Sequence, residues 1–331
     1  MPYIPSLDGL RAIAVVLVLA FHARVPGATG GFLGVDLFFV LSGYLITRLL
    51  AAEYARSGTI AVGEFYMRRL RRLWPALFAL LAAYVVAAPV IYGDATTHLR
   101  DALVAALYLS DYGMALWRIP QFLQHTWSLS VEEHFYLLWP PVLLGIFKLP
   151  ERRRIAALAA LFVAATTWRW ASYGESSWSM TYYRFDTRLS GLFLGSALGL
   201  AGLEARRWKL LLGLALFSYA AVESSWRYGP SLKYLMTFAE LGAALMIVGA
   251  PLSRLLSAAP LAWVGRMSYG VYLWHYPVMY WLRQEGFDGW TTFALGAAFS
   301  LTASAISYYT VEARFRARSH VHPVMRHARA E

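Results

Sequence analysis

LDGLRAIAVVLVLAFHAR, residues 7–24, is a run of apolar residues that carries two ionisable side chains well inside it, Arg11 and His22. A helix needs about 20 predominantly apolar residues to cross a bilayer, and this segment is close to that length. Ionisable side chains at membrane depth are costly and usually functional. The segment therefore predicts a first membrane helix that also carries a candidate site.

The spacing of Arg11 and His22 places both side chains on one face of that helix. Eleven residues at about 100° each end roughly 20° beyond three full turns, and a rise of about 1.5 Å per residue separates the two by roughly 16 Å. Two structural roles remain open, because Arg11 can extend to a lipid headgroup and His22 can be a hydrogen-bonded helix contact. The shared face favours a functional role for the pair.

A turn follows at residues 26–31, PGATGG, and a second apolar segment, FLGVDLFFVLSGYLITRLL, occupies residues 32–50. We expect an antiparallel helical hairpin with its bend near residue 29. His22 and Asp36 are equidistant from the bend and should lie at similar depth. A carboxylate beside an imidazole fixes the tautomer of the ring, so Asp36 is expected to orient His22. Asp36 can also be the N-cap of the second helix.

The composition is that of a membrane protein with many helices. Hydrophobic residues make up 59% of the chain and charged residues 15%, and the mean hydropathy is +0.47. The net charge of +11 lies in short gaps between apolar segments, which indicates topology signals and phosphate contacts and excludes a nucleic-acid-binding domain. The absence of cysteine excludes disulfides and a cysteine nucleophile. We expect no metal, and a first helix that is retained rather than cleaved as a signal peptide.

Ten apolar segments predict an all-α, polytopic membrane protein. They lie at about residues 8–24, 33–51, 74–92, 129–148, 155–171, 185–202, 209–223, 234–251, 267–283 and 291–312. With both termini in the cytoplasm, 20 of the 30 Lys and Arg residues fall on the inner side, as the positive-inside rule requires.

Residues 99–117 are nearly apolar enough for an eleventh span, but a crossing there would move Arg152, Arg153 and Arg154 to the outside. We therefore interpret this segment as an outer-side or partly inserted helix. The domain prediction is one membrane domain at residues 1–315, followed by a short basic cytoplasmic tail at residues 316–331.

The segment EFYMRRLRRLWP, residues 64–75, alternates apolar and basic side chains. It predicts a short amphipathic helix at the inner surface that ends at Pro75. Its arginines, Arg68, Arg69, Arg71 and Arg72, are suited to binding phosphates bidentately. A topological anchor bound to anionic lipid is the alternative interpretation.

The segment HTWSLSVEEHFYLLWP, residues 125–140, opens the fourth span. Ser130 and Glu133 match a capping box, which gives Glu133 a structural role. Glu132 points about 100° away from Glu133 and is freer to face a cavity. Favourable electrostatics at a helix start explains both carboxylates equally well.

Two later spans carry further candidates. RFDTRLSGLFLGSALG, residues 184–199, contains Arg188, which can pair with Asp186 or with a polar substrate, and glycines at 191, 195 and 199 whose spacing predicts close helix packing. GRMSYGVYLWHYPVMYW, residues 265–281, places His275 near mid-membrane, just before the kink expected at Pro277. His275 is a candidate functional residue, with a polar helix contact as the alternative.

Together these segments resemble the acyltransferase 3 family of membrane O-acyltransferases. The resemblance runs through SLDGLRAIAVVLVLAFH, GVDLFFVLSGYLI, FYMRRLRRLWP, HTWSLSVEEHFYLLWP, the Arg188 segment and SYGVYLWHYP. It implies a protein of ten spans in the bacterial cytoplasmic membrane. It also implies transfer of an acyl group, usually acetyl, from cytoplasmic acyl-CoA to a hydroxyl, typically of a sugar in a cell-surface glycan and sometimes of a secondary metabolite.

The resemblance also implies that His22 is the essential histidine, that Arg11 is its partner and that Arg68 to Arg72 form the inner basic motif. The resulting candidates fall into three groups. The catalytic candidates are His22, Asp36, Arg11 and Glu132; the acyl-CoA candidates are Arg11, Arg68, Arg69, Arg71, Arg72, Ser42 and Tyr44; and the acceptor candidates are Trp127, Ser128, Glu133, Arg188 and His275.

The chain departs from the family pattern at two positions. Ser190 stands where an acid is usual, and His134 stands where glutamine is usual. We expect no appended extracytoplasmic SGNH-type domain and therefore expect the membrane domain to handle the acceptor alone.

The expected mechanism has His22, oriented by Asp36, take the proton of an acceptor hydroxyl that attacks the thioester. A two-step route through acyl-Ser42 or acyl-His22 is the chemical variant. A transporter or flippase in which Arg11, His22, Asp36 and His275 line a path is the alternative function, and an inactive receptor or scaffold is a third. The expected partners are acyl-CoA, a carbohydrate or glycoconjugate and membrane lipid. The acceptor's identity, the acyl length and the oligomeric state, including a homodimer, stay open.

Overall fold

The computed structural model describes residues 3–317, and within that range every regular element is a helix. A helix is found at each of the ten predicted segments. Five helical stretches are long and apolar enough to cross a membrane: Pro5–His22, Gly31–Ser57, Val62–Tyr92, Glu151–Glu175 and Ser231–Leu252. These stretches confirm an all-α architecture with membrane helices, whereas the total of ten spans and the side of each terminus remain predictions.

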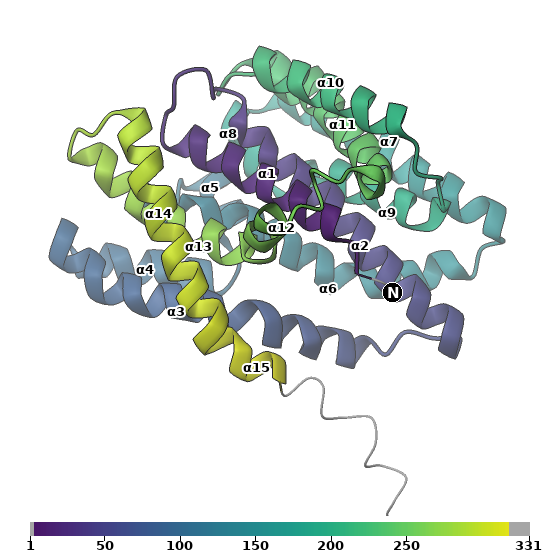
Figure 1. Ribbon diagram of the computed structural model, residues 1–331, viewed down its shortest axis with the longest axis horizontal. Helices are drawn as coiled ribbons and strands as arrows, with labels where there is room; N and C mark the ends of the chain where they lie inside the picture. Colours follow the sequence, from purple (N-terminus) through teal and green to yellow (C-terminus); the bar gives the residue numbers. More distant parts are fainter. Residues whose placement is uncertain (1–2, 318–331) are drawn as a thin grey trace, which may run out of the picture.

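The predicted hairpin forms the centre of the molecule (Figure 1). Helix α1 runs over Pro5–His22, a short turn of helix η1 follows at Gly31–Leu33, and α2 runs over Gly34–Ser57. Helix α2 ends where Gly58 adopts the left-handed conformation with φ 71°, a conformation in which glycine costs little.

Helix α3, Val62–Tyr92, corrects the prediction that a short helix ends at Pro75. Pro75 and Pro89 both lie inside this 31-residue helix. An internal proline removes one backbone hydrogen bond, but Phe65, Leu77 and Leu80 on either side of Pro75 are fully buried in the core. Packing of this face compensates for the missing bond and keeps the helix continuous.

Residues 99–117 do not form one long helix. They are divided between α4, Ala95–Ala106, and α5, Ser110–Leu116, with Tyr108 at φ 53° between them. Each helix is much shorter than the roughly 20 residues needed for a crossing.

Helix α6, Trp127–Phe147, follows the turn η2, Gln124–Thr126, and the predicted capping box is wrong. The helix begins three residues before Ser130, whose hydroxyl donates to the Thr126 carbonyl at 3.2 Å and accepts from the Ser110 backbone N–H at 3.1 Å. Ser130 therefore ties α5 to α6, and Glu133 loses its predicted capping role.

The next elements form the side of the bundle that packs on α2 through α9 and α11. They are α7 (Glu151–Glu175), α8 (Trp178–Tyr183), η3 (Phe185–Thr187), α9 (Leu189–Ala201), α10 (Arg207–Glu223), η4 (Ser231–Leu235), α11 (Met236–Gly249) and η5 (Ala250–Leu252). The predicted glycine packing is confirmed for α9, because a Cβ at Gly195 would lie 2.0 Å from the Val40 carbonyl oxygen. Gly43 of α2 meets Leu192 of α9 equally closely, so the two backbones are in direct contact.

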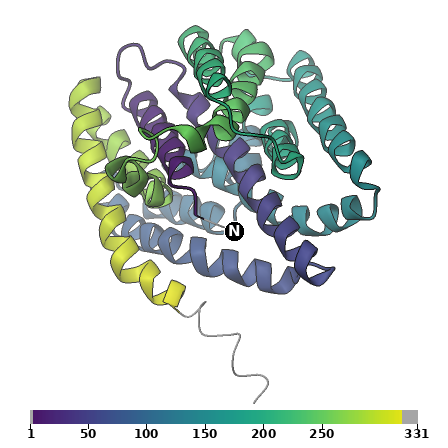
Figure 2. The same cartoon turned by 45° about the vertical axis from the view of Figure 1, so that its right-hand side comes forward.

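The chain closes with α12 (Ala259–Arg266), α13 (Ser268–Gln284), α14 (Gly289–Ser307), η6 (Tyr308–Glu312) and α15 (Ala313–Ala317). Figure 2 shows α14, in yellow, and α7, in teal, on opposite flanks of the central hairpin. Helix α15 crosses the predicted boundary at residue 315, and residues 318–331 of the predicted tail lie outside the described residues.

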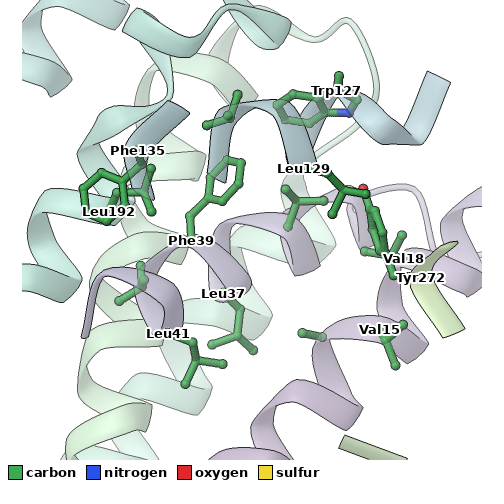
Figure 3. Packing of buried hydrophobic residues seen from close by; sticks show 14 of the residues in the cluster. Val15, Val18, Leu37, Phe39, Leu41, Trp127, Leu129, Phe135, Leu192 and Tyr272 are labelled. Atoms are coloured by element: carbon green, nitrogen blue, oxygen red, sulfur yellow. The ribbon is translucent and has the colours of Figure 1, made fainter. Parts of the chain in front are cut away.

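The core forms where α1, α2, α6, α9 and α13 converge. Figure 3 shows its side chains from all five helices: Val15, Val18, Leu37, Phe39, Leu41, Trp127, Leu129, Phe135, Leu192 and Tyr272. This arrangement places residues from distant parts of the sequence around two cavities.

Candidate active site

The first cavity, which we name the basic cavity, has a volume of about 290 Å³. Four arginines contribute to its wall together with a single carboxylate, that of Glu132. The polar and aromatic lining residues are Arg11, Arg69, Arg72, Arg266, Glu132, Ser42, Ser128, Ser268, Phe38, Phe39, Tyr136, Tyr269 and Tyr272. The cavity therefore suits an anionic ligand.

Two of the four arginines predicted on α3 line this cavity, Arg69 and Arg72. The guanidinium of Arg69 lies 5.6 Å from the centre of the Phe65 ring and 5.7 Å from that of Tyr136. Its buried Nε has no hydrogen-bond partner. The ring contacts hold Arg69 in place, and the unpartnered donor is available to a ligand.

The other two arginines of the predicted cluster do not line the basic cavity. Arg68 pairs with Glu53 at 3.1 Å and with Glu64 at 3.4 Å, and Arg71 is absent from the lining. Arg266 takes their place from the end of α12. In the sequence, Arg266 was only one of the basic residues expected on the inner side of the membrane. Its approach to α3 depends on tertiary folding, which the sequence did not reveal.

Arg11 contributes to the same cavity from α1. Its guanidinium forms a 3.0 Å ion pair with Asp8, one turn earlier. Asp8 also accepts a hydrogen bond from Tyr3 at 2.7 Å. Arg11 is thus held by its own helix while it faces the cavity.

Hydroxyl groups surround Glu132 at one wall of the basic cavity. Ser42 and Tyr136 share a hydrogen bond of 2.5 Å, and Ser128 and Tyr272 share one of 2.6 Å. Glu133, which was predicted to contact the acceptor, lines neither this cavity nor the second one.

Tyr44 was predicted to contact acyl-CoA but does not line the basic cavity either. Its hydroxyl accepts a hydrogen bond from Arg48, one turn later on α2. It lies two residues beyond Ser42, and successive helical residues point about 100° apart. Two residues therefore amount to about 200°, so the Tyr44 side chain points away from the cavity that Ser42 lines.

The second cavity, which we name the aromatic cavity, has a volume of about 390 Å³. More than half of its lining residues carry phenyl, phenol or indole rings, a feature that the sequence did not reveal. Its ring-bearing and polar lining residues are Phe21, Phe32, Trp127, Tyr182, Tyr183, Trp226, Tyr272, Tyr276, Tyr280, His22, His125, Gln124, Arg24 and Arg283. Among the predicted acceptor residues, Trp127 lies here and Ser128 lines the basic cavity.

His22 lines the aromatic cavity and contacts the fully buried His275, a predicted acceptor residue that lines neither cavity. Nδ1 of His22 lies 2.8 Å from Nε2 of His275, and Nδ1 of His275 lies 2.6 Å from the Tyr272 carbonyl oxygen. A carbonyl only accepts, so Nδ1 of a neutral His275 carries the proton and its Nε2 is an acceptor. Nδ1 of His22 must then donate the hydrogen bond. Nε2 of a neutral His22 therefore carries no proton and has a free lone pair.

His125 is a third buried histidine beside this pair. Its Nε2 lies 3.0 Å from the Leu273 carbonyl oxygen and therefore carries the proton, while its buried Nδ1 has no partner. Burial lowers the pKa of His125 well below 6.5, because desolvation disfavours the charged ring. His125 thus presents a neutral ring with one free acceptor.

The predicted contact between Asp36 and His22 is wrong. Asp36 forms a buried ion pair with Arg188 at 2.9 Å, and it makes no capping hydrogen bond at the start of α2. Arg188 also lies over the rings of Phe39, Trp127 and Tyr182, the nearest at 4.7 Å. Its expected pairing with Asp186 does not form, because Asp186 is bonded to Arg184 and Trp168. The Asp36–Arg188 pair joins α2 to the start of α9.

A second buried ion pair accounts for the departure at Ser190. Arg169 of α7 lies 2.8 Å from Glu240 of α11 and 2.6 Å from the Ser190 hydroxyl. Ser190 also donates to Glu240 at 2.6 Å. A carboxylate from α11 therefore lies beside Ser190, at the position where an acid is usual in the family. Both Arg169 and Glu240 were missed at the sequence level, although each is a charge inside an apolar run.

The two cavities share walls. Val35 and Tyr272 line both of them. Helix α1 passes alongside, with Arg11 in the basic cavity and His22 in the aromatic cavity. The roughly 16 Å expected between these positions along α1 therefore separates an arginine of one cavity from a histidine of the other.

The sequence pattern of an acyltransferase domain matches residues 4–309. This chain belongs to the acyltransferase 3 family. The match includes both cavities and every helix from α1 to α14, so the family assignment applies to the whole described fold.

Three known proteins are similar to this chain over most of its length. The peptidoglycan O-acetyltransferase OatA of Listeria monocytogenes is 34% identical over 84% of this chain and 49% of its own length. The putative peptidoglycan O-acetyltransferase YrhL of Bacillus subtilis is 35% identical over 84% and 49%. The O-acetyltransferase OatA of Staphylococcus aureus is 33% identical over 87% and 52%. The chain spans about half the length of these relatives, and no solved structure matches it.

Proposed function

We propose that this protein is an integral-membrane O-acyltransferase. It moves an acyl group, most simply acetyl, from cytoplasmic acyl-CoA in the basic cavity to a hydroxyl of a carbohydrate or glycoconjugate in the aromatic cavity. The observation that carries this proposal is the contact between the two cavities beside α1, with arginines around one and His22 in the other.

The basic cavity has the chemistry that acyl-CoA requires. CoA carries phosphates at one end and the thioester at the end of a long pantetheine arm. Arg69, Arg72 and Arg266 supply guanidinium groups for the phosphates, and guanidinium groups bind phosphate bidentately. The apolar part of the lining suits the arm, which then extends toward Tyr272 and the aromatic cavity.

The aromatic cavity has the chemistry that a sugar requires. The C–H faces of a pyranose stack on indole and phenol rings, such as those of Trp127, Trp226 and Tyr182. The names of the relatives describe O-acetylation of peptidoglycan, which is a glycan. A glycan acceptor is therefore the class that both the cavity and the relatives support.

The acyl group moves in one balanced step. Nε2 of His22 takes the proton of the acceptor hydroxyl while its oxygen attacks the thioester carbonyl. The C–O bond forms, the C–S bond breaks, and the departing thiolate takes up the proton from His22. A positioned base of this kind contributes about 10²- to 10⁴-fold.

A two-step variant remains within this proposal. Ser42 lines the basic cavity beside Tyr136, so acyl-Ser42 or acyl-His22 would form before the acceptor arrives. Incubation with radiolabelled acetyl-CoA in the absence of acceptor distinguishes the two routes, since only the two-step route yields labelled protein.

We place the protein in the bacterial cytoplasmic membrane with both termini in the cytoplasm. The basic cavity then opens toward the cytoplasmic pool of acyl-CoA, and the aromatic cavity lies nearer the outer surface, where cell-surface glycans are found. Cysteine labelling at Met67 and Leu255, both exposed, should give inner-side accessibility, and labelling at Trp290 should give outer-side accessibility.

His22→Ala tests the proposal directly. The purified variant should keep its fold and bind acetyl-CoA with unchanged affinity, yet its acetylation of a glycan acceptor should fall by at least about 10²-fold. Wild-type turnover in this variant would remove His22 from the mechanism. Acceptor movement across vesicles without release of CoA by the wild-type protein would instead favour the transporter.

A further inference from the structure

The lining of the aromatic cavity is positively charged. Arg24 and Arg283 belong to it, and no aspartate or glutamate does, within the part of the chain that the structure describes. Arg283 is held by a 2.5 Å hydrogen bond from Nη1 to the backbone carbonyl of His22 and lies 5.7 Å from the centre of the Tyr280 ring. One of its guanidinium nitrogens is therefore bonded to the backbone of the proposed base, and the side chain belongs to a lining without a protein carboxylate in the described range.

Two further arginines, Arg118 and Arg227, act electrostatically on one lining residue of this cavity. Burial raises the pKa of Tyr183, a lining residue, and the positive charges of Arg227 and Arg118 oppose that shift. Neither arginine forms a salt bridge with any residue from 3 to 317, and the same is true of Arg24. Arg24, which lines the cavity, and Arg118 and Arg227, which act on a lining residue, are thus cations without a salt-bridge partner among the described residues.

Three of these arginines have a costly backbone conformation. Arg24, Arg118 and Arg227 have φ values of 60°, 57° and 67°. A non-glycine residue in this region costs about 1 kcal/mol or more, and such residues cluster at ligand sites. Strained residues held at one cavity are expected where their side-chain positions matter.

His125 provides an independent polar feature in the same cavity. Its side chain is 1% exposed, and its Nδ1 is without a partner. Because the ring is neutral with its proton on Nε2, Nδ1 accepts a hydrogen bond, as from a sugar hydroxyl. The cavity therefore offers rings for a pyranose face, an acceptor for a hydroxyl and cations for an anion.

We propose that the acceptor is an anionic glycan, in which the acylated sugar or its neighbour carries a carboxylate or a phosphate that binds Arg24 and Arg283. The proposal rests on the proposed function, since it names the class of acceptor for that reaction. Anion binding at this position fixes the sugar relative to His22, because Arg283 contacts the backbone of that residue. A neutral glycan of equal size would lack this constraint.

Topology alone does not explain these arginines. In the predicted arrangement the aromatic cavity faces the outer side, whereas basic residues concentrate on the inner side. Cations are least expected in the outer loops, and here they gather at one cavity. Ligand recognition gives a reason for their placement.

Three matched acceptors test the proposal with purified enzyme and acetyl-CoA. They are a neutral tetrasaccharide of N-acetylglucosamine, the same tetrasaccharide with a carboxylate ether on one ring, and the tetrasaccharide 1-phosphate. We expect at least one anionic acceptor to have a KM about tenfold or more below that of the neutral one, in keeping with a charge-assisted hydrogen bond. Preference for the carboxylate or for the phosphate identifies the anion.

Arg24→Gln supplies the matched variant, and Arg100→Gln supplies the control. Arg100 is an arginine that lines neither cavity and pairs with Asp101 at 3.4 Å. Arg24→Gln should raise the KM of the preferred anionic acceptor about tenfold and leave the KM values of the neutral acceptor and of acetyl-CoA unchanged. Arg100→Gln should change none of the three.

Equal KM values for all three acceptors in the wild type would overturn the anionic-glycan proposal and leave the acyltransferase intact. An equal rise for neutral and anionic acceptors in Arg24→Gln would overturn it as well, because the arginine would then support the fold of the cavity only. Failure of the proposed function looks different, since no acceptor would then be acetylated and no CoA released.

Discussion

At the scale of single residues, the chemistry depends on which atoms of two histidines carry protons. The backbone carbonyl of Tyr272 fixes the proton of His275, and His275 in turn fixes that of His22. This arrangement replaces the carboxylate that usually orients a catalytic imidazole. In the proposed mechanism His275 is therefore a positioning residue, whereas His22 is the base.

Substitution of His275 separates positioning from structure. A glutamine can accept from His22 Nδ1 with its amide oxygen and donate to Tyr272 with its amide nitrogen, whereas a phenylalanine can do neither. We expect His275→Phe to lower kcat about 10²-fold or more with little change in KM, and His275→Gln to restore much of the loss. Steady-state kinetics on both variants checks this, and an equal loss in both would contradict a tautomer-setting role.

The arginines of α3 allow a matched comparison on one helix. Arg72 lines the basic cavity, while Arg68 is exposed and paired with Glu53 and Glu64. Arg72→Gln should raise the Kd for CoA about tenfold, the typical effect of losing a charge-assisted hydrogen bond, and Arg68→Gln should leave it nearly unchanged. Calorimetric titration with CoA measures both. Similar weakening in the two variants would show that only the general positive charge of the helix matters.

At the scale of elements, the contact between α2 and α9 fixes the position of one wall of the basic cavity. Gly43 and Gly195 let the two backbones touch, and the buried Asp36–Arg188 ion pair joins the same two elements. Ser42 adjoins Gly43 and lines the basic cavity. Helix packing and site geometry are thus coupled through neighbouring residues.

Gly195→Leu should separate α2 from α9. A Cβ at this position would meet the Val40 carbonyl oxygen at 2.0 Å, so the helices must move apart, at a typical cost of about 1–3 kcal/mol for overpacking. Thermal unfolding in detergent should show a lower Tm. Gly145→Ala in α6 is the control, because a Cβ there would meet nothing within 4 Å, and its Tm should stay level or rise slightly. Equal Tm values for the wild type and Gly195→Leu would contradict the close packing.

At the scale of the whole molecule, two cavities with different linings meet inside one helical bundle. In the proposed mechanism the donor and the acceptor need not cross the membrane, because each would approach from its own side and only the acyl group would pass between them. Bringing both reactants into one site replaces a bimolecular encounter by a positioned one. The residues at the junction, Val35 and Tyr272, are then the point at which transfer can be blocked.

Val35→Trp should block passage of the acyl group without removing either binding site. The indole would fill the junction between the cavities, so acetylation should fall by at least about 10²-fold, while the Kd for CoA stays within about threefold because the arginines are untouched. Val16→Trp is the control, since Val16 lies on α1 with 44% of its surface exposed. Turnover and CoA titration on both variants check the prediction, and normal turnover in Val35→Trp would place the path of the acyl group elsewhere.

The sequence by itself determined the helical membrane architecture and the family. It also determined that Arg11 and His22 lie on one face of α1 and that α9 packs closely on another helix. These features depend on hydrophobic periodicity, on helical geometry and on short motifs, all of which are local properties of the chain. Only the tertiary structure decided that His22 meets His275 rather than Asp36, that Arg69 and Arg72 but not Arg68 line the basic cavity, and that an aromatic cavity exists. The physical reason is that each buried polar side chain pairs with whichever partner the packing brings within reach. Helix packing brings residue 22 to residue 275 and residue 36 to residue 188, and no local pattern in the sequence encodes that packing.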